Sequence, residues 1–273
     1  MILEQTKSVW KMYREQTGNR VVLFFERLHQ IGAFAIITGV VTFRKFNVAR
    51  RVVHPLIFHQ ILRSGVHLFG MVAFIGIALG LVIIGQTVTL LSQVGATEYV
   101  GVVMVTVVMR ELGPLLTAVL VLARAGTANM VELGMSRALG EVEVLESLGI
   151  DPIHYLVMPR VIGLALAVFC LATYLVGMTF ISGWLFAFLH NVPVTLSDYS
   201  GQLGAALHWE DFLLFAMKTS AFGVIIAVVS CYHGLAKPLK VEDVSSVTSR
   251  AVVESVVGCV LVDAVFIVAY LVL

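Results

Sequence analysis

The stretch Val66-His-Leu-Phe-Gly-Met-Val-Ala-Phe-Ile-Gly-Ile-Ala-Leu-Gly-Leu-Val-Ile-Ile-Gly-Gln-Thr-Val-Thr-Leu-Leu91 contains no aspartate, glutamate, lysine or arginine. A helix needs about 20 apolar residues to cross a bilayer core that is about 30 Å thick. An uncharged run of this length therefore predicts a transmembrane helix, because only helices and closed barrels satisfy their own backbone hydrogen bonds in lipid. The rest of the chain follows the same pattern.

Four more segments have the length and apolar character of a membrane-spanning helix. The chain is 59% hydrophobic and only 13% charged, with a mean hydropathy of +0.97, which is more apolar surface than a soluble domain can bury. The five predicted spans are Val66–Leu91, Val100–Ala123, Val161–Leu189, Phe212–Leu235 and Val247–Val272. The formal net charge of +1 gives no reason to expect a nucleic-acid partner. We therefore expect an all-α, polytopic membrane bundle.

Basic residues in the connecting segments predict how this bundle is oriented. Lysine and arginine prefer the cytoplasmic side of a membrane. Ten of them precede Gly65, whereas segments 92–99 and 190–211 contain none. The alternation predicts a cytoplasmic N-terminus, five spans and a C-terminus on the opposite side.

Residues 1–54 are predicted to form a basic interfacial region ahead of a membrane domain at residues 55–273. Within this region, the segment Val21–Phe43 has an uninterrupted apolar run only from Ile31 to Phe43, and basic residues flank both of its ends. That length favours an amphipathic helix lying on an anionic membrane surface. A sixth span is the alternative.

Six charged residues lie inside the predicted spans, Arg250 and Glu254 near the start of the fifth span and Arg110, Glu111, Lys218 and Asp263 deeper in the membrane. A charge at the centre of a bilayer costs about 3 kcal/mol on insertion scales, so each is expected to face protein or water and to have a partner. At a rise of about 1.5 Å per residue, the four deeper residues can share one layer in the outer half of the membrane. Pro114 cannot donate to the carbonyl of Arg110, which predicts a kink or an opened turn there.

Two interpretations of this layer follow from the residues alone. The charges can form a structural salt-bridge network that fixes the register of the helices. They can also form the polar lining of a cavity that receives a charged lipid headgroup.

The segment Glu132–Ser147 predicts a short amphipathic helix on the cytoplasmic side, with Arg137 and Glu141 as an i, i+4 pair. Its apolar stripe comprises Met135, Ala138, Val142 and Leu145. Gly149 is predicted to end this helix. Asp151 is predicted to be the N-cap of the next helix, with Pro152 in its first turn. The stripe is expected to enter a groove of another protein, or alternatively to lie flat on the membrane.

Gly76 and Gly80 form a GxxxG motif in the first span. Small residues at this spacing let another helix approach closely. The motif predicts either packing within one chain or association with a second copy.

Several motifs occur in the order found in one family of permeases. They are Arg110-Glu-Leu-Gly-Pro-Leu-Leu-Thr-Ala118, Ala123-Arg-Ala-Gly126, Glu132-Leu-Gly134, Leu145-Glu-Ser-Leu-Gly-Ile-Asp-Pro152, Tyr155-Leu-Val-Met-Pro-Arg160 and Val247-Thr-Ser-Arg-Ala-Val-Val253, followed by Asp263. Over about residues 50–273 the chain resembles the MlaE family. It departs from the family at Gly140, where many relatives carry glutamate, and at Ala123, which replaces a glycine.

The resemblance implies an ABC transporter permease of the bacterial inner membrane that forms a homodimer and contributes to outer-membrane lipid homeostasis. Its implied partners are a cytoplasmic ABC ATPase, a periplasmic MCE-domain protein that exchanges phospholipid with it, and a small cytoplasmic STAS-domain subunit. Arg110 and Glu111 would lie beside the lipid cavity, and Arg124 and Arg160 would support helix packing. The coupling helix that the ATPase grips would contain Glu132, Arg137, Glu141, Glu143, Leu145 and Glu146.

The sequence contains no nucleotide-binding G-x-x-x-x-G-K-[ST] motif, so ATP and Mg²⁺ are expected in the ATPase and no cofactor in this chain. The three cysteines and eight histidines show no metal-ligand spacing, and no catalytic residue or metal site is expected. A proton-coupled secondary transporter or a lipid scramblase is the rival function, because Glu111 and Asp263 could carry protons. Against a secondary transporter, the two halves show no inverted repeat of broken helices.

Overall fold

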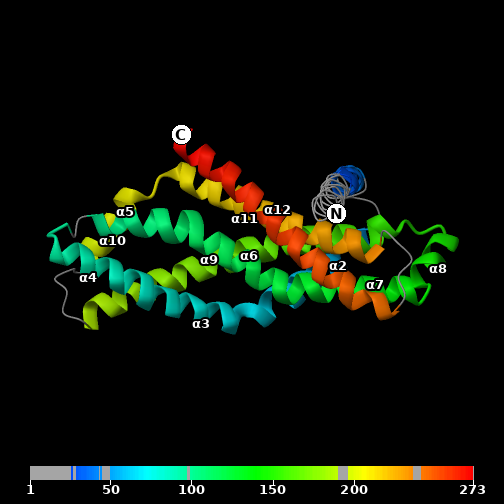
Figure 1. Ribbon diagram of the computed structural model, residues 1–273, viewed down its shortest axis with the longest axis horizontal. Coiled ribbons are helices and arrows are strands. Elements are labelled where there is room, and N and C mark those ends of the chain that lie inside the picture. The colour runs from blue at the N-terminus through cyan, green and yellow to red at the C-terminus, as the bar shows by residue number, and fades with distance from the viewer. Residues whose placement is uncertain are drawn as a thin grey trace, which may run out of the picture.

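The computed structural model describes residues 29–42, 50–96, 99–189, 196–235 and 241–272, together with Glu26 and Arg44. Every regular element in these ranges is a helix, as expected. The helices form an elongated bundle with α8 at one end of the long axis and α4, α5 and α10 at the other (Figure 1). The expectations for residues 1–25 lie outside the described residues.

The helices follow one another with short connections. In chain order they are α2 (Arg50–Gly65), η1 (Val66–Leu68), α3 (Phe69–Leu79), η2 (Gly80–Ile84), α4 (Gly85–Gln93), α5 (Val100–Met104), η4 (Val105–Leu112), α6 (Gly113–Val121), η5 (Leu122–Gly126), α7 (Thr127–Ala138), α8 (Glu141–Ser147), η6 (Ile153–Val157), α9 (Met158–Leu189), α10 (Leu196–Ala206), α11 (Trp209–Leu235), η7 (Val241–Asp243) and α12 (Val244–Val272). The expected boundary between residues 54 and 55 falls inside α2, because the first span continues without a break into this helix.

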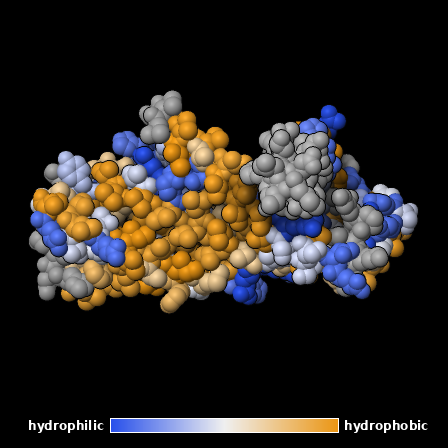
Figure 2. Space-filling view, in the orientation of Figure 1, coloured by the Kyte–Doolittle hydropathy of each residue, from blue (hydrophilic) through white to orange (hydrophobic). Residues whose placement is uncertain are grey.

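Five of the described helical stretches are long and apolar enough to cross a membrane, which confirms the predicted number of spans. They are Val53–Leu91, Val100–Ala138, Ile153–Leu189, Trp209–Leu235 and Val244–Tyr270. The first three extend beyond their apolar cores toward the end that carries α8. On the face shown in Figure 2, hydrophobic residues cover the middle of the molecule and hydrophilic residues lie toward its two ends, as expected for a bundle that stands in a bilayer.

The core is built around α9, which packs against α2, α3, α6 and α11. Leu164, Leu171 and Leu175 of α9 and Phe222 and Ile226 of α11 are fully buried within it. Because this core lies in the membrane span, close packing of side chains holds the helices together.

The two glycines of the GxxxG motif face α9 of the same chain. Gly76 lies against the carbonyl oxygen of Leu175 and the Cβ of Met178, each 3.0 Å from where a Cβ of residue 76 would stand. At Gly80 an added Cβ would overlap the hydroxyl of Ser182 and the carbonyl oxygen of Thr179. The GxxxG motif therefore serves packing within one chain. Since α9 occupies this face, a second copy cannot use it.

The helix His29–Thr42 is too short to cross a membrane, and the described residues contain no sixth span. Ile31 and Phe34 on this helix pack against the core, and Tyr232 of α11 donates a hydrogen bond of 2.7 Å to Gln30. Its placement on a membrane surface remains a prediction.

The predicted amphipathic helix Glu132–Ser147 is two helices, and the prediction of one continuous helix was wrong. α7 ends at Ala138, and Gly140 has φ +77°, the left-handed conformation that ends a helix and that glycine adopts without steric cost. α8 then begins at Glu141. Gly140, one of the two positions at which the chain departs from the MlaE pattern that it resembles, therefore separates α8 from the membrane span.

The predicted stop and start after α8 are confirmed. Gly149 has φ +76°. Asp151 then accepts a hydrogen bond of 3.0 Å from the backbone N–H of Ile153 and caps the next helix, with Pro152 in its first turn.

Candidate functional site

The second span is opened just before Pro114. Residues Val105–Leu112 form a π-helix, η4, in place of the usual α-helix, and Pro114 is the second residue of α6. Proline has no N–H to give to the carbonyl four residues earlier, that of Arg110. Lys218 of α11 donates to this carbonyl instead, over 2.7 Å. The opened turn that the sequence predicts is thus present, and it has a partner from another helix.

Lys218 is the centre of a charge cluster that joins three spans. Its ammonium group lies 3.0 Å from Oε2 of Glu111 and 2.6 Å from Oδ1 of Asp263 in α12, and its side chain is fully buried. The ammonium group donates hydrogen bonds to Glu111 and to the carbonyl of Arg110, and its contact with Asp263 is an ion pair. The expectation that these charges share one layer is confirmed.

Arg110 turns away from Lys218 and pairs with a residue that the sequence analysis missed. Its Nη2 lies 2.9 Å from Oδ1 of Asp211, a buried residue in the first turn of α11, and its guanidinium lies over the ring of Tyr270, 4.9 Å from the ring centre. Asp211 also accepts a hydrogen bond from the backbone N–H of His208. We assigned Asp211 to a polar loop, although an acidic residue directly before an apolar run is a signal of a helix start.

The cluster reaches the surface of the bundle on one side. The side chains of Arg110 and Glu111 are 27% and 31% exposed, whereas those of Lys218 and Asp263 are buried. Figure 2 shows a hydrophilic patch within the hydrophobic belt, where α11 begins beside the C-terminal part of α12. The salt-bridge network is therefore present. Its buried members Lys218 and Asp211 hold Glu111 and Arg110 at the surface. The lining of a lipid cavity remains a prediction.

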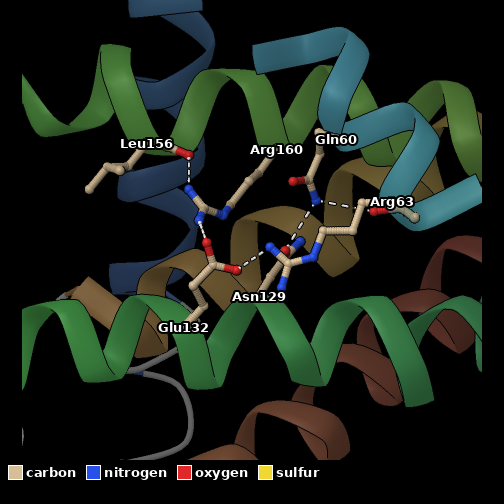
Figure 3. A network of polar contacts seen from close by, with 7 residues as sticks. Gln60, Arg63, Asn129, Glu132, Leu156 and Arg160 are labelled. Atoms are coloured by element: carbon tan, nitrogen blue, oxygen red, sulfur yellow. Dashed lines mark hydrogen bonds and ion pairs between the residues drawn. The ribbon is translucent and has the colours of Figure 1, made fainter. Parts of the chain in front are cut away.

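A second polar network ties α2, α7 and α9 together (Figure 3). Glu132 of α7 binds Arg63 of α2 over 2.6 Å and Arg160 of α9 over 2.9 Å. Arg160 also donates to the carbonyl of Leu156, over 2.7 Å. The sequence placed Glu132 at the start of a projecting coupling helix; instead it lies on α7, with both carboxylate oxygens bound to neighbouring helices. The packing role expected of Arg160 is consistent with this geometry.

We predict that Glu132→Gln lowers the free energy of unfolding by about 1–2 kcal/mol, because two ion pairs lose their shared anion while remaining partly solvated. Chemical denaturation of the purified protein in detergent measures the change. Glu141→Gln, on an exposed residue of α8, serves as the control and should change stability by less than about 0.5 kcal/mol. Equal stabilities of the two variants would contradict a structural role for Glu132.

The acidic residues of α8 do not pair as predicted. Arg137 contacts Glu143, over 3.3 Å, and Glu146, over 3.8 Å, rather than Glu141. The i, i+4 pairing of Arg137 with Glu141 was wrong, because the break at Gly140 folds α8 back beside the end of α7. Of the predicted stripe, Val142 is buried and Leu145 is half-buried.

No cluster of metal-ligating side chains occurs in the ranges that the structure describes. The cluster around Lys218 also lacks an arrangement typical of nucleophilic catalysis, since its charged groups are paired with one another. The arrangement suits binding and positioning of charged groups within a membrane rather than bond cleavage.

Comparison with known proteins agrees with this geometry. The family description "Permease MlaE" matches residues 57–269, which include every charged residue of both networks. The chain belongs to the MlaE permease family. This MlaE-family permease is 30% identical over 246 residues to a probable ABC transporter permease protein of Rickettsia felis, covering 87% of this chain and 90% of the relative.

Two further relatives of the permease are a chloroplast protein and a second probable ABC transporter permease protein. It is 32% identical to the chloroplast protein TRIGALACTOSYLDIACYLGLYCEROL 1 of Arabidopsis thaliana over 75% of this chain and 58% of that protein. It is 36% identical to a probable ABC transporter permease protein of Synechocystis over 60% of this chain and 62% of the relative. The chain is thus a multi-pass membrane permease of the ABC transporter type.

Proposed function

We propose that this permease moves phospholipid between the inner membrane of a bacterium and a periplasmic MCE-type lipid carrier, and so contributes to outer-membrane lipid homeostasis. It would act as a homodimer, with a cytoplasmic ATPase that binds ATP and Mg²⁺ and with a small STAS-domain subunit. The N-terminus would face the cytoplasm and the C-terminus the periplasm. The observation that carries the proposal is the charge cluster around Lys218, which presents Arg110 and Glu111 at the surface of a hydrophobic span.

The chemistry of the cluster fits a phospholipid headgroup. A guanidinium binds phosphate oxygens through two parallel donors. Glu111, next to Arg110, offers a carboxylate to an ammonium group such as those of zwitterionic headgroups. The name of the Arabidopsis relative includes that of a glycolipid, which supports a lipid as the substrate.

The position of α8 fits the docking of an ATPase. α8 lies at one end of the molecule (Figure 1), and Leu139, Val144 and Leu148 around it are 64%, 58% and 69% exposed. Exposed apolar residues on a short projecting helix are typical of a surface that enters a groove of another protein. We infer that this surface is the coupling element.

A continuous helical path joins the two sites. The span Val100–Ala138 carries Arg110 in its first third and ends directly before the turn at Gly140 that leads into α8. We infer that a movement of α8 on ATP binding is passed along this span to η4, where the π-helical turn and the Lys218 contact can change. Such a transmission requires two packing states that both sites bias.

The test uses the whole complex, purified from membranes with the subunits that accompany it and reconstituted into vesicles with labelled phospholipid. We expect transfer to the lipid carrier to require ATP hydrolysis. Transfer without the ATPase, driven by a proton gradient or by no energy source, would instead support the secondary transporter or the scramblase.

We predict that Val144→Glu lowers ATP-driven lipid transfer at least about tenfold, because a charge would be buried in the apolar contact with the ATPase. The unfolding temperature of the permease should stay unchanged, since Val144 is exposed. Val94→Glu, on an exposed residue at the opposite end, is the matched control and should leave co-purification of the ATPase intact. Full transfer by the Val144 variant would exclude α8 from coupling.

A further inference from the structure

A cavity of about 550 Å³ lies between α2, η1, η5 and α7, at a distance from the charge cluster. Its polar lining consists of His59, Arg63, Ser64, His67, Arg124 and Asn129. Figure 3 shows Arg63 and Asn129 facing one another from two neighbouring helices. Arg124 lies 14 residues after Arg110 on the same span, so at about 1.5 Å per residue the two arginines are roughly 20 Å apart along the membrane normal.

The cavity contains a buried hydrogen-bond donor that is not used. Asn129 is only 2% exposed, and its oxygen accepts a hydrogen bond of 3.1 Å from Gln60. Its Nδ2 has no hydrogen-bond partner in the described chain. Gln60 is itself held by a second hydrogen bond to Ser64, of 3.1 Å. Since buried donors are almost always satisfied, we expect an acceptor oxygen beside Nδ2, from a water molecule or from a ligand.

The charge of the cavity favours an anion. Arg63 is paired with Glu132, which it shares with Arg160. Arg124 also lines the cavity, is exposed, and has no acidic partner among the residues that the structure describes. Three guanidinium groups and one carboxylate therefore leave positive charge in excess around the cavity. Arginine is well suited to bind phosphate oxygens.

The depth of the cavity identifies the source of that anion. Arg63 lies three residues before the start of the apolar stretch Val66–Leu91, and Arg124 directly follows the apolar stretch Val100–Ala123. The cavity is therefore level with the edge of the bilayer core, at the end of the bundle that carries α8 (Figure 1). Phospholipid phosphates lie at this depth.

We propose that the cavity between α2 and α7 binds the phosphate group of an anionic phospholipid headgroup in the leaflet at that end. Arg124 contacts the phosphate oxygens as the unpaired cation, and Nδ2 of Asn129 donates to one of them. Gln60 and the Glu132 network hold Asn129 and Arg63 in place. This is a second lipid site, separate from the cluster at Arg110, and it does not depend on ATP-driven transport.

The test measures lipid binding to the full-length permease, purified in detergent, by native mass spectrometry. The purified protein is titrated with dioleoylphosphatidylglycerol, with dioleoylglycerol, which lacks the phosphate, and with inorganic phosphate as a competitor. No nucleotide is added, so a failure of the transport proposal does not affect the result.

We expect Arg124→Gln and Asn129→Asp each to raise the Kd for phosphatidylglycerol about tenfold or more, because each change removes a donor to an anion. Asn129→Asp keeps the acceptor for Gln60, so it tests the donor with little change of shape. The matched control is Arg250→Gln, an exposed arginine of α12 that does not line the cavity, and it should change the Kd by less than about twofold. Dioleoylglycerol should bind more weakly than phosphatidylglycerol.

Wild-type affinity in both cavity variants, or equal binding of dioleoylglycerol, would overturn the proposal. Inorganic phosphate that displaces the lipid at equal concentration would also overturn it, by assigning the cavity to the free anion. A cysteine placed at Leu62, which also lines the cavity, gives a local readout in a Cys170→Ser background. Phosphatidylglycerol should slow its modification by a maleimide severalfold in this background, and not after Arg124→Gln is added. An unchanged rate would contradict occupancy of the cavity.

Discussion

Replacing Lys218 by methionine is expected to lower the free energy of unfolding by about 3–5 kcal/mol, the cost of removing one partner from a buried ion pair. Methionine fills a similar volume, so the loss is electrostatic rather than one of packing. The substitution leaves the carboxylates of Glu111 and Asp263 without their shared cation. It also removes the hydrogen-bond donor to the carbonyl of Arg110, which has no helical donor because residue 114 is proline.

Denaturant titration or thermal unfolding in detergent measures this loss, with Arg250→Gln as the control for removing a positive charge at an exposed site. Adding Asp263→Leu to the Lys218→Met variant should restore part of the stability, because one uncompensated carboxylate is then removed. Wild-type stability of Lys218→Met would mean that the cluster does not hold the three spans together.

Replacing Gly80 by valine is expected to cost about 3 kcal/mol, near the upper end of overpacking penalties. A Cβ at this position overlaps the carbonyl oxygen of Thr179, which belongs to the backbone of α9 and cannot rotate away as a side chain could. The first span and α9 would have to separate along the face where Gly76 also makes close contact.

Gly70→Val is the matched control, since it changes the same residue type in the same span and an added Cβ there has no atom within 4 Å. Its stability should stay within about 0.5 kcal/mol of that of the wild type. Because α9 of the same chain covers the Gly80 face, Gly80→Val should unfold at a lower temperature at every protein concentration. If it only weakened dimerisation, the motif would act between copies after all.

The location of the charge cluster could be predicted from the sequence, but its pairing could not. Arg110, Glu111, Lys218 and Asp263 are conspicuous because ionisable residues are rare inside apolar spans, and counting residues from the ends of the spans placed them at one depth. Which carboxylate meets which cation depends on how each helix is rotated. This rotation directs Lys218 toward Asp263 and Arg110 toward Asp211.

The coupling region illustrates a second limit. A local pattern of apolar residues favoured one helix from Glu132 to Ser147, and a single glycine within that pattern is compatible with a helix at a modest cost. In the structure Gly140 adopts a left-handed conformation, and Glu132 is drawn into ion pairs with Arg63 and Arg160, which are distant in sequence. Only contacts between helices reveal that Glu132 belongs to the bundle and α8 to the projecting end.

The sequence by itself determined the five spans, the opened turn before Pro114 and the helix start at Asp151. These features depend on apolar length, on a missing N–H and on capping, which act within one segment of chain. The tertiary structure decided the ion pairs, the partner of the Gly76 and Gly80 face, the break at Gly140 and the cavity beside Arg124. Each of these depends on which faces of two helices meet, and that is fixed by the packing of the whole bundle.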